Sequence, residues 1–154
     1  MLEEKRIQIF IDSVNKYFNE VNNIGVKVGS PYLIEGNKPS VYDYTGIIGI
    51  SGPYRGSVYF SAPRVLLHNL LLTIKEPDKS EETMMDLIGE IANTISGNAR
   101  AEYGEEFVIS TPLVVKGQPD EVYLPKTTRS FVIPIIWKEY TANIVVSIEQ
   151  RSNP

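Results

Sequence analysis

The stretch from Glu81 to Tyr103 is the part of this sequence that most constrains the fold. Within it, apolar side chains recur every three or four residues, a spacing that lines them along one side of an α-helix. These residues are Met84, Ile88, Ile91, Ile95 and Ala99. The pattern predicts a long amphipathic helix at about 80–103 that buries one side in the core.

The opposite side of this predicted helix has an unusual composition. Glu90, Asn93, Gly97 and Arg100 recur at the same helical spacing. At about 100° per residue, they fall within an arc of about 80° opposite the apolar side. A solvated Glu and Asn on an exposed face is the simpler interpretation. However, Gly in a helix interior costs about 1 kcal/mol relative to Ala, and Asn93 and Asn98 are also weak helix formers. This cost favours a functional site, although packing of Gly97 against a neighbouring element would explain part of it.

The other segments predict an α+β fold. Two further helices are predicted, at Glu3 to Val21 and from Ser61 to Ile74. The predicted extended segments are Val26 to Ile34, a hairpin over Val41 to Ser61, Phe107 to Val115, a short strand at Glu121 to Pro125, and a hairpin of Ser130 to Trp137 with Tyr140 to Glu149. Strands and helices do not follow one another in the regular order of βαβ units, so we expect an antiparallel sheet with the helices packed on one face. The 154 residues fit one domain, 1–154.

Two helix starts can be assigned from capping residues. Ser61, followed by Pro63, is expected to cap the short helix. For the long helix, Asp78 with Glu81 resembles a capping box, and Ser80 is an equally good cap.

Composition excludes several classes of function. The sequence has no cysteine, which rules out disulfides, thiolate catalysis and iron–sulfur ligation. Its net charge of −4 argues against nucleic acid as a partner. Its N-terminus has no continuous apolar run, and the apolar stretch from Val65 to Ile74 is too short to span a bilayer. We therefore expect a cytoplasmic protein that binds neither nucleic acid nor membrane.

The common catalytic motifs are also missing. His68 is the only histidine and lies among leucines, and the sequence has no G-x-S-x-G elbow and no phosphate-binding loop. Asp86 with Glu90 is the only compact carboxylate pair on the exposed face, and such pairs are usually solvated charge.

Glu90 and Asn93 remain as the candidate functional residues. A helix face lacks a cavity, so it would act by insertion into another protein's active site, where an amide orients water and a carboxylate pairs with a basic group.

The segment from Gly89 to Ala99 resembles the helix signature of the CheC/CheX/FliY group of chemotaxis phosphatases: Glu, two residues, Asn, three residues and Gly-Asn. A single copy in a chain of this length resembles CheX more than CheC. The resemblance implies a CheC-like fold and a hydrolase that dephosphorylates a CheY-type response regulator in chemotaxis or other two-component signalling. It implies that Asn93 orients the attacking water, that Glu90 pairs with the regulator's lysine, and that Gly97 allows close approach.

The resemblance has further implications for partners. Asp86, Gly97, Asn98 and Arg100 are assigned to binding the regulator. This chain is expected to bind no cofactor, since the Mg²⁺ belongs to the regulator, and to form a homodimer with joined sheets. CheC-like proteins can carry a second motif on the pseudo-symmetric helix. Here Leu66 replaces the Glu three residues before Asn69, so we expect one catalytic face per subunit.

Two alternatives remain open on the sequence. The same helix would serve a non-catalytic binding module related to flagellar switch proteins such as FliM, docking a regulator or switch component without hydrolysis. A phosphatase for a regulator outside chemotaxis would have the same sequence features.

Overall fold

The computed structural model describes residues 2–22, 26–34, 41–117 and 130–150. Its helices are α1 (Leu2–Asn22), α2 (Arg64–Thr73) and α3 (Glu81–Tyr103). Its strands are β1 (Lys27–Val28), β2 (Tyr32–Leu33), β3 (Tyr44–Ser51), β4 (Tyr54–Ala62), β5 (Val108–Ile109), β6 (Leu113–Lys116), β7 (Ser130–Trp137) and β8 (Tyr140–Gln150). The predicted long helix is confirmed. The predicted strand at Glu121 to Pro125 lies outside the described residues.

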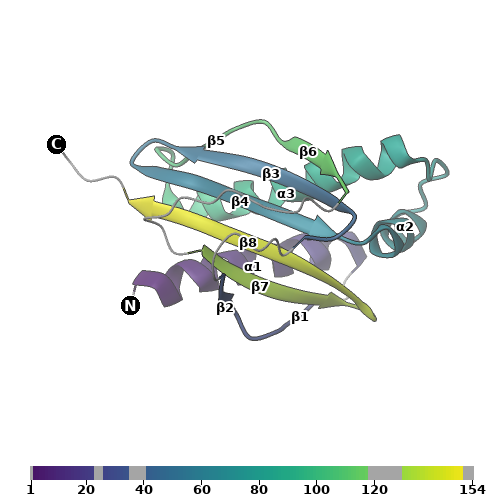
Figure 1. Cartoon of the computed structure of the whole chain (residues 1–154), viewed down its shortest axis with the longest axis horizontal. Coiled ribbons are helices and arrows are strands. Elements are labelled where there is room, and N and C mark those ends of the chain that lie inside the picture. Colours follow the sequence, from purple (N-terminus) through teal and green to yellow (C-terminus); the bar gives the residue numbers. More distant parts are fainter. Residues whose placement is uncertain (1, 23–25, 35–40, 118–129, 151–154) are drawn as a thin grey trace.

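The strands form one antiparallel sheet in the order β1-β7-β8-β4-β3-β5, with β2 also paired to β7 and β6 to β3. The long helices α1 and α3 lie together across one face of this sheet, and α2 lies at one end of it (Figure 1). This arrangement confirms the predicted α+β fold with an antiparallel sheet and helices on one face.

The core lies between the sheet and the long helices. The apolar side of α3 is buried throughout, as its spacing predicted. It packs against β3 and β4, and it belongs to one apolar cluster with alternate residues of the central strands, among them Val58 and Phe60 of β4 and Ile144 and Val146 of β8. Because successive strand residues point to opposite faces, these positions present a continuous apolar surface to the core. The helix is thereby fixed with its opposite side facing outward.

Of the two predicted helix caps, that of α3 is confirmed and that of α2 is not. Ser80 caps α3, since its hydroxyl accepts a hydrogen bond from the Thr83 N–H at 3.3 Å. The prediction that Ser61 caps α2 was wrong. Ser61 lies in β4, and its hydroxyl hydrogen-bonds Thr45 at 2.9 Å. The first N–H of α2 is instead satisfied by Asp43, whose carboxylate accepts from Arg64 N at 2.8 Å, a contact between residues far apart in sequence.

Candidate functional site

The N-terminal end of α3 is tied to the sheet by a polar network. The Glu81 carboxylate accepts a hydrogen bond from the Tyr44 hydroxyl at 3.0 Å and pairs with Lys116 Nζ at 2.7 Å. These interactions lower the pKa of Glu81, the contact with Lys116 having the larger effect and that with Tyr44 the next. They also raise the pKa of Lys116. The network joins the first turn of α3 to β3 and β6.

The C-terminal end of α3 is held by the segment that follows it. Arg100 Nε donates to the Phe107 carbonyl at 2.9 Å, and its Nη2 donates to the Glu105 carbonyl at 3.1 Å. The rings of Tyr103 and Phe107 stack with centroids 4.4 Å apart. With both ends fixed, α3 is a rigid support, which is the kind of element that positions functional side chains well.

The outer side of α3 presents the predicted site. Asp86, Glu90 and Asn93 are all exposed. Among the residues that the structure describes, neither Glu90 nor Asn93 makes a hydrogen bond or ion pair that would occupy its side chain. Residues one turn apart on a helix have Cβ atoms about 5–6 Å apart, so the carboxylate and the amide project side by side. Both groups are therefore available to a partner.

Gly97 continues this side of the helix without serving the fold. A Cβ placed on Gly97 would meet no atom within 4 Å. Packing against a neighbouring element therefore does not explain the glycine. Gly in a helix interior costs about 1 kcal/mol relative to Ala, and no contact of Gly97 with the described residues requires a glycine there.

Asn98 and Arg100 are engaged within the chain. The Asn98 amide donates to the Ser13 carbonyl of α1 at 3.2 Å, and Arg100 makes the two carbonyl contacts described above. The assignment of both residues to partner binding stays a prediction. Their observed contacts join α3 to α1 and to the segment leading into β5.

Tyr17 of α1 is a neighbour of the site that the sequence did not reveal. Its side chain is buried, and burial together with the nearby Glu90 carboxylate raises the pKa of its hydroxyl above the ordinary value. Glu90 thus lies along the boundary between α3 and α1. The signal in the sequence was the apolar face of α1, but nothing there indicated which part of α3 it would meet.

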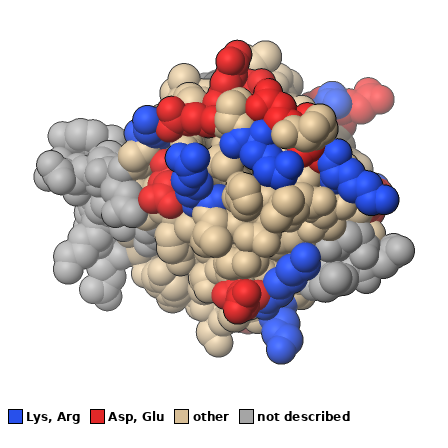
Figure 2. All heavy atoms as spheres, turned by 90° about the vertical axis from the view of Figure 1, so that its right-hand side faces the viewer, with Lys and Arg blue, Asp and Glu red and all other residues tan. Residues whose placement is uncertain are grey.

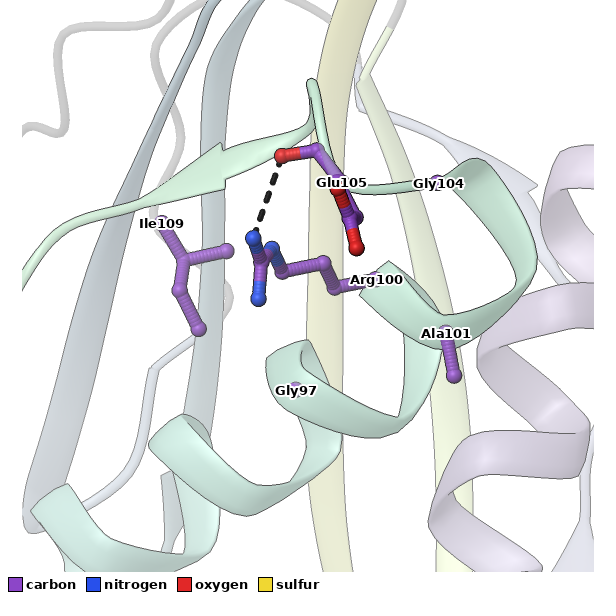
Figure 3. Close-up of a pocket in the computed structure, with 6 residues that line it drawn as sticks. All are labelled: Gly97, Arg100, Ala101, Gly104, Glu105 and Ile109. Carbon is purple, nitrogen blue, oxygen red and sulfur yellow. Dashed lines mark hydrogen bonds between the residues drawn. The ribbon is translucent and has the colours of Figure 1, made fainter.

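A hollow of about 300 Å³ opens beyond Gly97. It is lined by Gly97, Arg100, Ala101, Gly104, Glu105 and Ile109. Figure 3 shows the Arg100 side chain reaching from α3 toward Glu105, with Ile109 of β5 on the far side. This hollow was not predicted from the sequence, although the small residues Gly97, Ala101 and Gly104 recur at helical spacing and so face one side.

The α2 helix does not repeat the exposed pair of α3. In α2, Leu66 is fully buried, and the Asn69 amide donates to the Val65 carbonyl of its own helix at 2.8 Å. Figure 2 views the molecule from the α2 end, where charges of both signs mix and no broad basic area stands out. In the described ranges, no three His, Asp or Glu side chains are grouped closely enough to hold a metal ion. None of the described helices has the length and apolar character needed to cross a bilayer.

The arrangement suits positioning better than small-molecule catalysis. The Asn93 amide has both a donor and an acceptor for orienting water, and the Glu90 carboxylate has acceptors for a cationic group. Both sit on the exposed side of a helix that is held at its two ends. Such a face supplies chemistry where a second protein provides the concave site and the reacting group.

Comparison with known proteins finds a matching family and several similar structures. A family described as chemotaxis phosphatase CheX matches residues 44–136. A CheC-like superfamily protein from Shewanella sp. PV-4 has a similar crystal structure, with TM-score 0.81 and 27% identity over 94% of this chain and 97% of that one. A chemotaxis protein CheX from Vibrio vulnificus shares the fold, with TM-score 0.79 and 23% identity over 94% and 99% of the two chains.

A third similar structure is a CheX–CheY–BeF3–Mg²⁺ complex from Borrelia burgdorferi. The matched chain has TM-score 0.71 and 17% identity, covering 94% of this chain and 97% of that one. A comparison with curated protein sequences finds no significant match.

Proposed function

The chain belongs to the CheX family of chemotaxis phosphatases, and on this premise we propose that its α3 face hydrolyses the aspartyl phosphate of a CheY-type response regulator. The observation that carries the proposal is the pair Glu90 and Asn93, exposed one turn apart on α3 and unoccupied by other described residues. The comparison structure of CheX with CheY supports the same class of partner.

Asn93 positions the nucleophile. Its side-chain amide, inserted beside the regulator's phosphorylated aspartate, holds a water molecule in line with the scissile P–O bond. The water oxygen bonds to phosphorus while the bond to the aspartyl oxygen breaks. One water and one acyl phosphate yield the free carboxylate and dihydrogen phosphate, so atoms and charge balance. Phosphoryl transfer depends on such positioning and on charge stabilisation more than on covalent participation by the protein.

Glu90 and Gly97 fix the approach of the two proteins. The Glu90 carboxylate pairs with a lysine of the regulator's active site, which sets the depth and rotation of α3 in that site. Gly97 lets the regulator's backbone approach the helix closely, which accounts for a glycine with no internal contact. Asp86, on the same side, adds a negative charge for the encounter.

The regulator, not this chain, supplies the divalent cation. Mg²⁺ bound to the regulator would offset charge on the phosphoryl oxygens, and this chain's part is restricted to the water and the lysine. We propose accordingly that the chain binds no cofactor of its own.

The chain is further proposed to act as one cytoplasmic domain that forms a homodimer. Exposed apolar residues at both edges of the sheet support the dimer: Tyr32 and Leu33 of β2, and Val108 of β5 with Leu113 of β6. Unpaired strand edges with exposed apolar side chains favour pairing with a second chain. Light scattering at micromolar concentration should give twice the mass of the chain, and a monomer would contradict this proposal.

The test of function is phosphate release from a phosphorylated, Mg²⁺-loaded regulator, with and without this protein. Acceleration of release by substoichiometric protein is the expected result, since a catalyst turns over. Tight binding of the phosphorylated regulator without any acceleration would contradict the proposal and favour the non-catalytic binding module.

A further inference from the structure

We propose that the hollow at the C-terminal end of α3 is an anchor site that receives one apolar side chain of the docked regulator. This inference rests on the proposed function, because the regulator is the occupant. It assigns recognition to residues distinct from the Glu90 and Asn93 pair. Ala101 and Ile109 supply the apolar contact, and Gly97 and Gly104 supply the space.

The hollow continues the proposed docking face. Gly97 belongs to both, as it lies on the side of α3 that presents Glu90 and Asn93 and also lines the hollow. At about 100° per residue, Ala101 and Gly104 fall within about 40° of Gly97 around the helix. A regulator that lies along α3 with its active site over Asn93 therefore passes directly over the hollow.

The size of the hollow suits a side chain. Its volume of about 300 Å³ stands at the lower limit of pockets that bind small molecules. Figure 3 shows that its lining comes from α3, from the turn that follows α3 and from Ile109 of β5. The hollow exists because Gly97, Ala101 and Gly104 carry one side-chain carbon between them. A protein partner can fill such a space with one protruding residue.

The lining combines apolar and charged residues. Ala101, Ile109 and the two glycines present carbon atoms, and Arg100 and Glu105 are the charged residues. Arg100 forms one wall, and its Nε and Nη2 already donate to main-chain carbonyls of the protein. Its planar guanidinium is thereby held in place, and such a plane stacks well on an aromatic ring. An aromatic or long aliphatic side chain matches this combination.

The docking face needs such an anchor. Two exposed polar residues position chemistry but bury little apolar surface, and protein interfaces draw most of their affinity from a few residues that fill pockets. Ala101 lies eight residues beyond Asn93, which is about 12 Å along the helix axis. The regulator residue that enters the hollow should therefore lie about 12 Å from its phosphorylated aspartate.

The test fills the hollow and separates binding from chemistry. Ala101→Leu places a larger side chain in it, at an exposed position and with a good helix former. Glu102→Leu, the matched control, adds the same side chain at the next exposed position, which does not line the hollow. In phosphate-release kinetics, Ala101→Leu should raise KM for the phosphorylated regulator about tenfold and leave kcat unchanged. Glu102→Leu should change KM less than about twofold.

Two results overturn the anchor site while leaving the proposed function intact. One is an Ala101→Leu variant with the KM of the active wild type, and the other is an equal rise in KM in both variants. If the wild type binds the regulator without hydrolysing it, the proposed function fails. In that case the anchor site is tested by the Kd for the regulator carrying BeF3 in place of the phosphoryl group. Ala101→Leu should raise this Kd about tenfold, and Glu102→Leu should raise it less than about twofold. Wild-type protein that neither hydrolyses nor binds overturns both.

Discussion

Gly46 of β3 faces the main-chain carbonyl of Ile88 in α3 so closely that a Cβ on residue 46 would lie 2.6 Å from that oxygen. The backbones of α3 and β3 are therefore in close contact at this point. The same sequence places a second glycine, Gly97, on the opposite side of α3, where a Cβ would meet nothing within 4 Å. One glycine permits the fold, and the other is free for a partner.

Gly46→Ala should destabilise the protein by about 1–3 kcal/mol, because a backbone carbonyl cannot move aside as a flexible side chain can. Urea unfolding followed by circular dichroism measures the change in the free energy of unfolding. An unchanged unfolding midpoint would show that α3 does not lie as close to β3 as described.

Gly97→Ala should have the opposite effect on stability. The added methyl finds open space, and Ala is favoured over Gly in a helix interior by about 1 kcal/mol, so the free energy of unfolding should rise by about that amount. The same variant should raise KM for the phosphorylated regulator, since the methyl occupies the line of approach. A variant that is more stable and binds the regulator as well as the wild type would remove the functional reason for Gly97.

The two exposed carboxylates of α3 should differ in their importance. Glu90→Gln should lower kcat/KM by about tenfold or more, since it leaves the regulator's lysine unpaired in a desolvated interface. Asp86→Asn, four residues away and nearer the rim, should lower kcat/KM by less than about threefold and mainly weaken its dependence on salt. Kinetics at two ionic strengths distinguish the effects, and equal losses in the two variants would contradict the separate roles.

The network at the start of α3 gives a pH dependence. The pKa of Glu81 is lowered from its ordinary 4.5 by Lys116 and Tyr44, so folding favours the ionised carboxylate. The resulting stabilisation is present above pH 4.5 and is lost as the pH falls through the lowered folded-state pKa. Glu81→Gln should therefore cost stability at pH 7 and cost less at pH 3. Urea unfolding at both values checks this.

Glu82→Gln is the control for that measurement. Glu82 is also an exposed carboxylate in the first turn of α3, but it makes no ion pair or hydrogen bond with other described residues. The difference between the two values of pH should be larger for Glu81→Gln than for Glu82→Gln, because Glu81 alone of the two belongs to the network with Tyr44 and Lys116. If the loss caused by Glu81→Gln were independent of pH, the network would not stabilise the ionised form in the way described.

The α3 helix and its outward face were predictable because both depend on periodicity within one segment. Spacing alone places Glu90, Asn93 and Gly97 on one side and the apolar stripe on the other. The antiparallel sheet followed in the same way from the order of helical and extended segments. These features are local, or nearly so, and the structure reproduces them.

Features that depend on contacts between residues distant in the sequence could not be predicted from local patterns. Ser61 has the right type and position to cap α2, but its pairing with Thr45 across the sheet takes precedence. At about 100° per residue, Arg100 falls on the same helix face as Asn93, whereas Asn98 lies about 140° away around the helix. Helical spacing alone did not show that Asn98 contacts α1 or that Arg100 contacts the segment before β5. The hollow at Ala101 required Ile109, whose place depends on the pairing of β5 with β3.

The measurement that tests the central claim most directly is the rate of phosphate release at saturating phosphorylated regulator, for Asn93→Ala and the matched variant Asn69→Ala. Asn69 lies on α2, where its amide donates to the Val65 carbonyl of its own helix. If Asn93 positions the attacking water, Asn93→Ala should lower kcat by about 100-fold or more, while Asn69→Ala leaves kcat near the wild-type value. Full activity of Asn93→Ala would contradict the account.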